Sequence, residues 1–188
     1  MINVLEKNNQ NISVIDLKSK LLENRIVLIT EEITPELATE IQSILLYLST
    51  SKDPISIYIN SPGGDVYSGL GIYDMIKLLQ NKGIIIKTVN IGICASMASI
   101  ILMSGSKGYR SSLLNSTIML HTASTYTHGK VNDVEVDIKE LRRIQDVLDN
   151  IIKTNCNADL VDKCKHHDLF LSSEEAKQFN IIDSLHEN

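Results

Sequence analysis

The chain has 188 residues, 43% of them hydrophobic and 22% charged, which is enough for one compact domain whose core needs no disulfide or metal. Its formal net charge of -5 argues against a nucleic-acid partner, because neutralising phosphates requires clustered Lys and Arg. No segment offers the roughly 18 consecutive apolar residues of a membrane helix, and the amino terminus lacks the pattern of an export signal. Cys94, Cys156 and Cys164 form no CxxC pair, which favours a reducing compartment, so the cytoplasm is the expected location.

Strand and helix patterns alternate through the first part of the chain. Residues 25–29 predict a buried strand, and a Thr-Pro pair predicts the cap and first position of a helix over 34–48. Alternating apolar residues over 55–60 predict a second strand, which stops at the Ser-Pro-Gly-Gly turn of 61–64. Apolar spacing predicts a helix through residues 70–79.

The same alternation continues through the middle of the chain. Residues 84–91 predict a strand and 95–103 a helix, with Gly105 placed where a left-handed C-terminal cap is expected. Residues 117–120 predict another strand, which ends at His121.

Two capping boxes are predicted near the carboxyl end. Asn132 with Glu135 is expected to open a long helix, and Ser172 with Glu175 a short one that Asn180 closes in a left-handed conformation. Because parallel neighbours need helical crossovers, the repeated strand-helix order predicts an α/β fold with a largely parallel sheet.

Candidate functional residues lie at two predicted strand-to-helix junctions. Pro62 lacks an N–H, and Gly63-Gly64 permits backbone conformations that turn N–H groups into a cleft, where they could bind an oxyanion. Ser96 opens a helix, whose free amides favour developing negative charge. A serine becomes a nucleophile only when a base takes its proton, and His121 is the best placed histidine. From these residues alone, an ordinary helix cap is the commoner role for a serine at the start of a helix, such as Ser96.

Five sequence blocks occur in an order that resembles the proteolytic subunit of the Clp protease family (ClpP). They are YINSPGG at 58–64, ASMA at 95–98, KGYR at 107–110, NSTIMLH at 115–121 and DLFLSSEEA at 168–176. The resemblance implies one ClpP/crotonase-like domain of repeated strand-helix units over residues 1–188. It also implies an axial N-terminal segment over about residues 1–18 and a protruding handle, a strand plus a long helix, over about residues 122–155.

The resemblance implies a role for each matching site residue. Ser96 would be the nucleophile, His121 its general base and Asp168 the group that orients the imidazole. The backbone N–H groups of Gly64 and Met97 would form the oxyanion hole, which the two free-amide junctions also indicate. The rival third members are Asp159, Asp162 and Asp183.

The implied substrate-binding residues are Gly63, Thr122, Ala123, Ser124 and Thr125. This region departs from the family, which usually continues after the catalytic histidine with Gln-Pro and a glycine-rich stretch. Here residues 122–127 read Thr-Ala-Ser-Thr-Tyr-Thr, and His167 stands where the family commonly has an Arg that helps to couple two rings. We therefore expect the active geometry to depend on the pairing of rings.

The expected function is that of a serine endopeptidase, endopeptidase Clp, acting in protein quality control. It would degrade unfolded polypeptides inside a tetradecamer of two stacked heptamers, either homomeric or shared with a ClpP paralogue, fed by an ATP-dependent AAA+ unfoldase of the ClpX, ClpA or ClpC type. No cofactor is expected in this chain, since its partner would use the ATP, and neither nucleic acid nor membrane is an expected partner.

Two other functions and a metal site are weighed against this one. The chain could be a weakly active structural or regulatory subunit of a mixed barrel, or an acyl-CoA enzyme of the crotonase type, whose chemistry needs no Ser-His-Asp set. No metal is expected, because the spacing of Cys156, Cys164, His166 and His167 matches no usual zinc signature.

Overall fold

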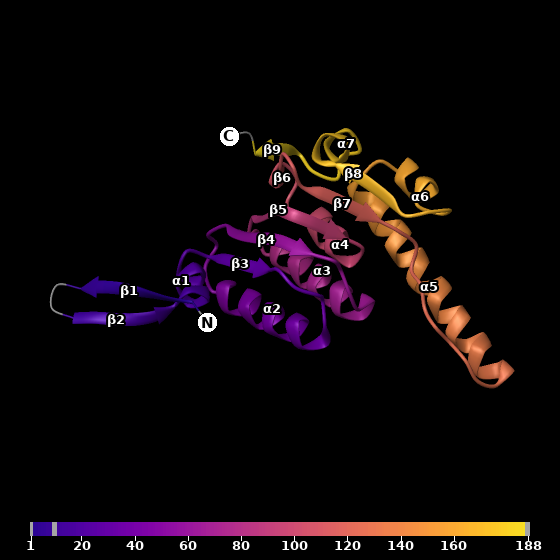
Figure 1. Cartoon of the computed structure of the whole chain (residues 1–188), viewed down its shortest axis with the longest axis horizontal. Helices are drawn as coiled ribbons and strands as arrows, with labels where there is room; N and C mark the ends of the chain where they lie inside the picture. The colour runs from indigo at the N-terminus through magenta and orange to yellow at the C-terminus, as the bar shows by residue number, and fades with distance from the viewer. Residues whose placement is uncertain (1, 9–10, 187–188) are drawn as a thin grey trace.

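A computed structural model describes residues 2–8 and 11–186. Figure 1 shows the hairpin of β1 and β2 and the long helix α5 projecting in different directions from a central α/β body. In chain order the elements are β1 (Asn3–Asn8), β2 (Asn11–Asp16), α1 (Leu17–Glu23), β3 (Ile26–Ile29), α2 (Pro35–Leu48), β4 (Ile55–Ser61), α3 (Val66–Asn81), β5 (Ile86–Ala95), α4 (Met97–Met103), β6 (Arg110–Leu113), β7 (Thr117–Leu120), α5 (Val131–Asn155), α6 (Asp159–Lys163), β8 (Leu169–Ser172), α7 (Ser173–Gln178) and β9 (Ser184–His186).

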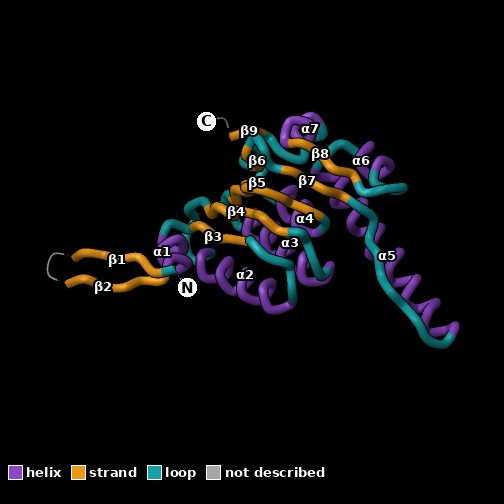
Figure 2. The backbone as a smooth tube through the Cα atoms, in the orientation of Figure 1, coloured by secondary structure: helices purple, strands orange, loops and turns teal. Residues whose placement is uncertain are grey.

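A seven-stranded sheet lies at the centre of the body. Its main path is β3-β4-β5-β6-β9, while β7 pairs with both β5 and β8. Every pair in this sheet is parallel except β7 with β8. Helices α2 and α3 pack beside each other along the strands (Figure 2). The predicted α/β fold with a largely parallel sheet is therefore confirmed.

Isoleucine supplies much of the core beneath the site. Ile55, Ile57 and Ile59 of β4 are fully buried, whereas the alternate residue Asn60 is exposed. Burying each such side chain stabilises the fold by about 1.5–3 kcal/mol. No helix in the described part of the chain is both long enough and apolar enough to cross a membrane.

The boundary between β5 and α4 differs from the prediction. Strand β5 runs to Ala95, and α4 begins only at Met97, because Ser96 between them has a left-handed φ of 52°. The left-handed cap predicted at Gly105 is wrong, since Ser104 ends the helix in a right-handed conformation. Gly105 serves close packing instead: a Cβ placed there would lie 2.3 Å from Thr88 Oγ1.

One of the two predicted capping boxes is wrong and the other is confirmed. Helix α5 begins at Val131, so Asn132 lies inside its first turn and cannot cap it. At α7 the Ser172 side chain accepts from the Glu175 N–H while the Glu175 carboxylate accepts from the Ser172 N–H. Asn180 has a φ of 59° and closes the turn after α7 as predicted.

The strand predicted within the handle does not form. Residues 122–130 pair with no strand in the described part of the chain. The Ala123 N–H instead donates to Gln145 Oε1 of α5 over 2.7 Å, so at this residue a helix side chain takes the place of a strand partner. The axial segment stays a prediction: residues 3–8 pair with residues 11–16 as antiparallel strands, and residues 1, 9 and 10 lie outside the described part.

A nearly buried ion pair ties the last strand to the body. Arg110, 2% exposed, donates to Asp183 from Nη2 over 2.7 Å and from Nε over 3.0 Å. Partial burial alone would raise the pKa of Asp183, but the hydrogen bonds and charge of Arg110 outweigh it, and the pKa lies below its ordinary value.

Replacing Asp183 by Asn is expected to destabilise the fold by about 3 kcal/mol at neutral pH, because Arg110 would stay buried without its counter-charge. A lowered folded-state pKa gives stability that is present above about pH 4 and is lost as the pH falls further. The difference between wild type and Asp183→Asn in urea unfolding should therefore shrink below pH 4. Asp162→Asn, whose ion pair with Lys165 is exposed, is the control and should change stability little. Equal effects of the two variants would contradict this role of Asp183.

Candidate active site

Ser96 occupies a strained turn between β5 and α4. Its φ of 52° and ψ of -124° are uncommon for a residue with a side chain and cost about 1–3 kcal/mol. The turn is held by the Ser96 N–H, which donates to Met119 O over 2.9 Å, and by Ser99, whose hydroxyl donates to Ser96 O over 2.6 Å. The Ser96 hydroxyl makes no capping bond to α4, so its interpretation as an ordinary helix cap is wrong.

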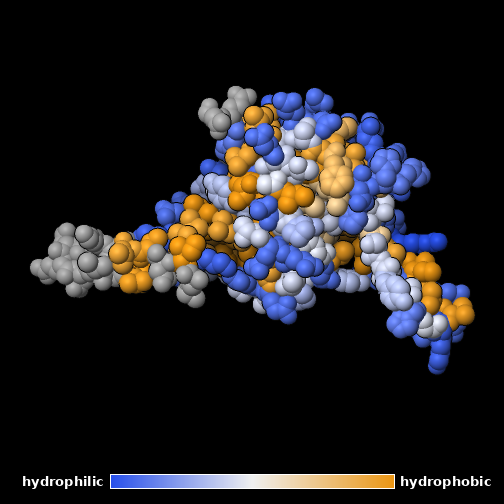
Figure 3. Space-filling view, viewed as in Figure 1, coloured by the Kyte–Doolittle hydropathy of each residue, from blue (hydrophilic) through white to orange (hydrophobic). Residues whose placement is uncertain are grey.

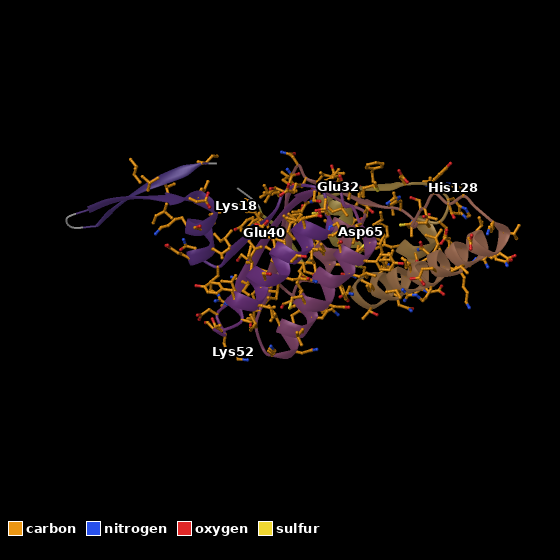
Figure 4. The ribbon with its side chains drawn as sticks, turned by 90° about the horizontal axis from the view of Figure 1, so that it is seen from below. Lys18, Glu32, Glu40, Lys52, Asp65 and His128 are labelled. Atoms are coloured by element: carbon orange, nitrogen blue, oxygen red, sulfur yellow. The ribbon has the colours of Figure 1, made fainter. Side chains whose placement is uncertain are left out.

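His121 reaches Ser96 because β7 and β5 are neighbours. Ala95 pairs with Met119 in the parallel ladder, and the chain then leads two residues on to the histidine. His121 Nε2 lies 2.8 Å from Ser96 Oγ, within hydrogen-bond distance, and both residues are half-buried. Figure 4 shows another histidine, His128, alongside the projecting part of α5, away from Asp65 at the start of α3.

Gly63 lies directly against the nucleophile's turn, and Gly64 lies against Ile33. A Cβ placed on Gly63, whose φ is 92°, would lie 2.7 Å from Ser96 Cβ and 3.0 Å from Met97 N. The next residue, Gly64, has a φ of 148° and bridges to Ile33. The N–H groups of Gly64 and Met97 donate to no acceptor within residues 2–8 and 11–186. Both amides are thus available to a ligand near the serine.

Asp168 is brought near His121 by the backbone. In the antiparallel pair of β7 and β8, Leu120 is opposite Leu169, so extending the register by one residue sets His121 opposite Asp168. The Asp168 side chain is exposed, and it makes no hydrogen bond to His121 among the residues that the structure describes. Asp168 is therefore adjacent to His121 in the fold but is not hydrogen-bonded to it.

The three alternatives to Asp168 as the partner of His121 are Asp159, Asp162 and Asp183, and none of them contacts the histidine through a hydrogen bond in the described part of the chain. Asp183 is held by Arg110, and Asp162 pairs with Lys165 over 2.6 Å. Asp159 is exposed at the start of α6. Neither Asp159 nor Asp162 contacts His121 through a hydrogen bond in the described part of the chain. Among the four carboxylates, Asp168 alone continues a strand register to the histidine.

A cavity opens beside Ser96 and His121, against the face of α5. Its walls are mostly apolar and include Leu148 and Ile152. Three further polar residues also line it: Gln145, Asp149 and Cys164. Burial, with a contribution from the nearby Asp149 charge, raises the pKa of the Cys164 thiol to about 11. The sequence patterns do not predict this cavity, although the i, i+4 spacing of Gln145 and Asp149 on a long predicted helix indicates a polar spot there.

A second, more open groove lies between the start of α3, residues 123–125 and α5. It is lined by Gly64 and by three of the predicted substrate-binding residues, Ala123, Ser124 and Thr125, whereas the other two, Gly63 and Thr122, do not line it. On its α5 side, Tyr67 donates to Glu140 over 2.9 Å. Hydrogen bonds from Arg143 and Tyr67 lower the pKa of Glu140 to about 2. Within the described residues, no three His, Cys, Asp or Glu side chains are grouped so that they could hold a metal ion.

A serine hydroxyl hydrogen-bonded to an imidazole, with the unpaired backbone amide of the next residue at a helix start, is the arrangement by which serine hydrolases carry out acyl transfer. A parallel α/β sheet presents these groups where its strands end. The fold and the site thus define the class as a serine hydrolase.

Comparison with known proteins identifies the family. The Clp protease family matches residues 8–188. An ATP-dependent Clp protease proteolytic subunit of Bacteroides fragilis is 36% identical over 187 residues, 97% of this chain and 88% of that protein. The subunit of Bacteroides thetaiotaomicron is 35% identical over 188 residues, covering 97% and 83%. An ATP-dependent Clp protease proteolytic subunit 1 of Salinibacter ruber is 36% identical over 186 residues, covering 97% and 78%. The chain belongs to the Clp protease family and is a serine-type endopeptidase.

Proposed function

We propose that Ser96 attacks the peptide carbonyl with His121 as its general base, and that this carries out the cleavage of unfolded polypeptides. The 2.8 Å separation of His121 Nε2 and Ser96 Oγ carries the proposal. The imidazole takes the hydroxyl proton as Oγ bonds to the carbonyl carbon, and then gives that proton to the leaving amine. His121 next takes a proton from water as the water oxygen bonds to the acyl carbon, and returns it to Oγ as the bond between that carbon and Oγ breaks, which frees Ser96.

The oxyanion of each tetrahedral intermediate is assigned to the N–H groups of Gly64 and Met97. Three observations support this assignment: both amides are unpaired within the described residues, Met97 N opens helix α4 directly after Ser96, and Gly64 follows Gly63, which packs against Ser96. Fixed donors stabilise charge as it develops without having to reorganise.

Asp168 is assigned the role of orienting His121. Its place in the strand register supports this, because a change in its side-chain rotamer could bring a carboxylate toward the imidazole without moving β8. Catalytic hydrogen bonds are often long in unliganded enzymes and tighten when substrate binds. We expect assembly or substrate to bring about this engagement.

Asp168→Asn is expected to lower kcat for degradation of casein, a largely unstructured protein, by about 10²–10⁴-fold, since an amide would favour the wrong tautomer of the imidazole. The measurement is the release of soluble fragments under steady-state conditions.

Asp159→Asn is the matched control for Asp168, because it removes an equal charge from another exposed position nearby in the chain. Its kcat should stay within about threefold of wild type, as is usual for surface changes. If the two variants retain the same activity, Asp168 is not the orienting group. If the wild-type protein cleaves casein in none of its assembled states, the proposed function itself is wrong.

Residues 122–125 are assigned to the binding of an extended substrate. They run beside α5 without a strand partner in the described part of the chain, and three of them line the open groove together with Gly64. A substrate backbone could pair there as an added strand, which selects unfolded over folded polypeptides. Gly63 contributes by letting the chain pass close to Ser96.

Assembly and an ATPase partner belong to the same proposal. The relatives are called subunits of ATP-dependent proteases, and this chain carries exposed apolar side chains on the projecting part of α5, namely Val131, Val136 and Ile138. Figure 3 shows hydrophobic surface there and on the N-terminal hairpin. We assign α5 to the contact between two stacked heptamers in the cytoplasm, fed by a AAA+ unfoldase. No cofactor is assigned to this chain. Sedimentation tests the assembly: full peptidase activity from single rings would exclude a dependence on ring pairing.

A further inference from the structure

A glutamine of α5 holds the segment that follows His121. Gln145 Oε1 accepts a hydrogen bond from the Ala123 N–H over 2.7 Å, and Gln145 Nε2 donates to Asp149 Oδ1 over 2.6 Å. All three residues are half-buried. A backbone N–H can only donate and an ionised carboxylate can only accept, so these two partners allow a single orientation of the Gln145 amide. Asp149 thereby fixes which end of that amide faces Ala123.

The segment held in this way is extended. A second contact, from the Thr127 hydroxyl to the Asp137 carboxylate, lies further along α5. The helix rises about 12 Å between Asp137 and Gln145. The chain covers that length from Ala123 to Thr127, so each of its residues advances about 3 Å, close to the rise of a β-strand. Figure 2 shows this loop running along α5.

The two backbone edges of this segment have different surroundings. The Ala123 N–H is directed at Gln145, which does not line the open groove. In an extended chain, successive residues point their backbone N–H and C=O groups to opposite edges. The backbone groups of Ser124 therefore face the other edge, where neither its N–H nor its C=O has a hydrogen-bond partner among the residues that the structure describes.

We propose that Gln145 is a positioning residue for the substrate: it occupies one edge of residues 122–125 and so keeps the backbone of Ser124 at the edge where a peptide pairs. The inference rests on the proposed function, in which this segment binds an extended substrate. Holding the segment before substrate arrives reduces the entropy that is lost on binding. Asp149 acts through Gln145, because its carboxylate orients the amide that receives the Ala123 N–H.

Gln145→Met removes the acceptor for Ala123 and keeps a side chain of similar length. KM for a short unstructured peptide should rise about tenfold, since a buried donor is left without its partner. The value of kcat should stay within about threefold of wild type. Labelling of Ser96 by a small fluorophosphonate should also keep its rate within about threefold, because this reaction needs His121 but no bound substrate strand.

Gln178→Met is the matched control, since Gln178 is an exposed glutamine at the end of α7. It should leave KM, kcat and the labelling rate as in wild type.

An exchange of the two polar groups tests the chain of hydrogen bonds itself. Gln145→Glu alone sets a second carboxylate against Asp149, and the repulsion should raise KM about tenfold. Gln145→Glu combined with Asp149→Asn keeps the net charge. The new carboxylate would still accept from the Ala123 N–H and would receive a hydrogen bond from the new amide, so KM should return to within about threefold of wild type.

Three results overturn the proposal: an unchanged KM in Gln145→Met, a labelling rate in Gln145→Met that falls as far as its kcat/KM, or a double variant no better than Gln145→Glu. In each case, peptide hydrolysis that needs Ser96 still upholds the proposed function. If the wild-type protein cleaves neither the peptide nor casein, the proposed function fails as well.

Discussion

Replacing Ser96 by Ala is expected to lower peptide hydrolysis by about 10⁴-fold or more, because no other group could form the acyl-enzyme. The observations behind this are the positive φ that turns the hydroxyl away from α4 and its hydrogen bond to His121. The residual rate would come from substrate binding and the oxyanion amides alone. Steady-state kcat/KM for a short unstructured peptide measures the effect without any need for an ATPase.

Ser104→Ala is the matched control for this loss. Ser104 is buried at the other end of α4, where its hydroxyl donates to Ile101 O over 2.6 Å. Its removal should leave kcat/KM within about threefold of wild type, since Ser104 contacts no site residue. Retention of a tenth or more of the wild-type activity by Ser96→Ala would show that another nucleophile acts.

Gly63→Ala is expected to lower kcat/KM by at least about 100-fold, since small displacements of reacting groups are that costly. The new methyl group would lie 2.6 Å from Ala95 O and 2.7 Å from Ser96 Cβ, so the nucleophile's turn must shift. The left-handed φ of 92° adds about 1–2 kcal/mol of backbone strain. Thermal unfolding and peptide hydrolysis, measured together, separate the two effects.

Gly83→Ala is the control that separates backbone strain at a positive φ from the steric clash of the new methyl group. Gly83 has a similar φ of 82°, but a Cβ placed there meets nothing within 4 Å. It should lose about 1–2 kcal/mol of stability and keep wild-type kcat/KM. Equal activity of the two alanine variants would contradict the close packing of Gly63 against Ser96 as a requirement for catalysis.

Local sequence patterns predicted the elements from β3 to α4 together with β7, α5 and α7, because period and capping are local properties; they did not predict β1, β2, α1, β6, α6, β8 or β9. The alternation over 55–60, the Thr34-Pro35 start of α2 and the box of Ser172 with Glu175 all appear in the structure. The failures have physical causes that lie elsewhere in the fold. The position of Gly105 after a helix predicts a cap, whereas Thr88, 17 residues earlier in the chain, requires its small size.

The site was only partly predictable for the same reason. Its residues were found from motifs, but motifs do not specify rotamers, so the exposed side chain of Asp168 could not be foreseen. Nor could the contact of Ala123 with Gln145, which depends on where α5 packs. Asp149 drew no attention in the sequence because a polar residue on a long helix is usually solvated; only the packing of α5 makes it part of the cavity.

Covalent labelling with a fluorophosphonate, followed by peptide mapping, tests most directly whether Ser96 and His121 form a working pair. The purified, assembled protein should gain one adduct per chain, located on Ser96, and His121→Ala should slow its formation by at least about 100-fold because no base takes the hydroxyl proton. An adduct on a different residue, or labelling of Ser96 at an unchanged rate without His121, would contradict the account.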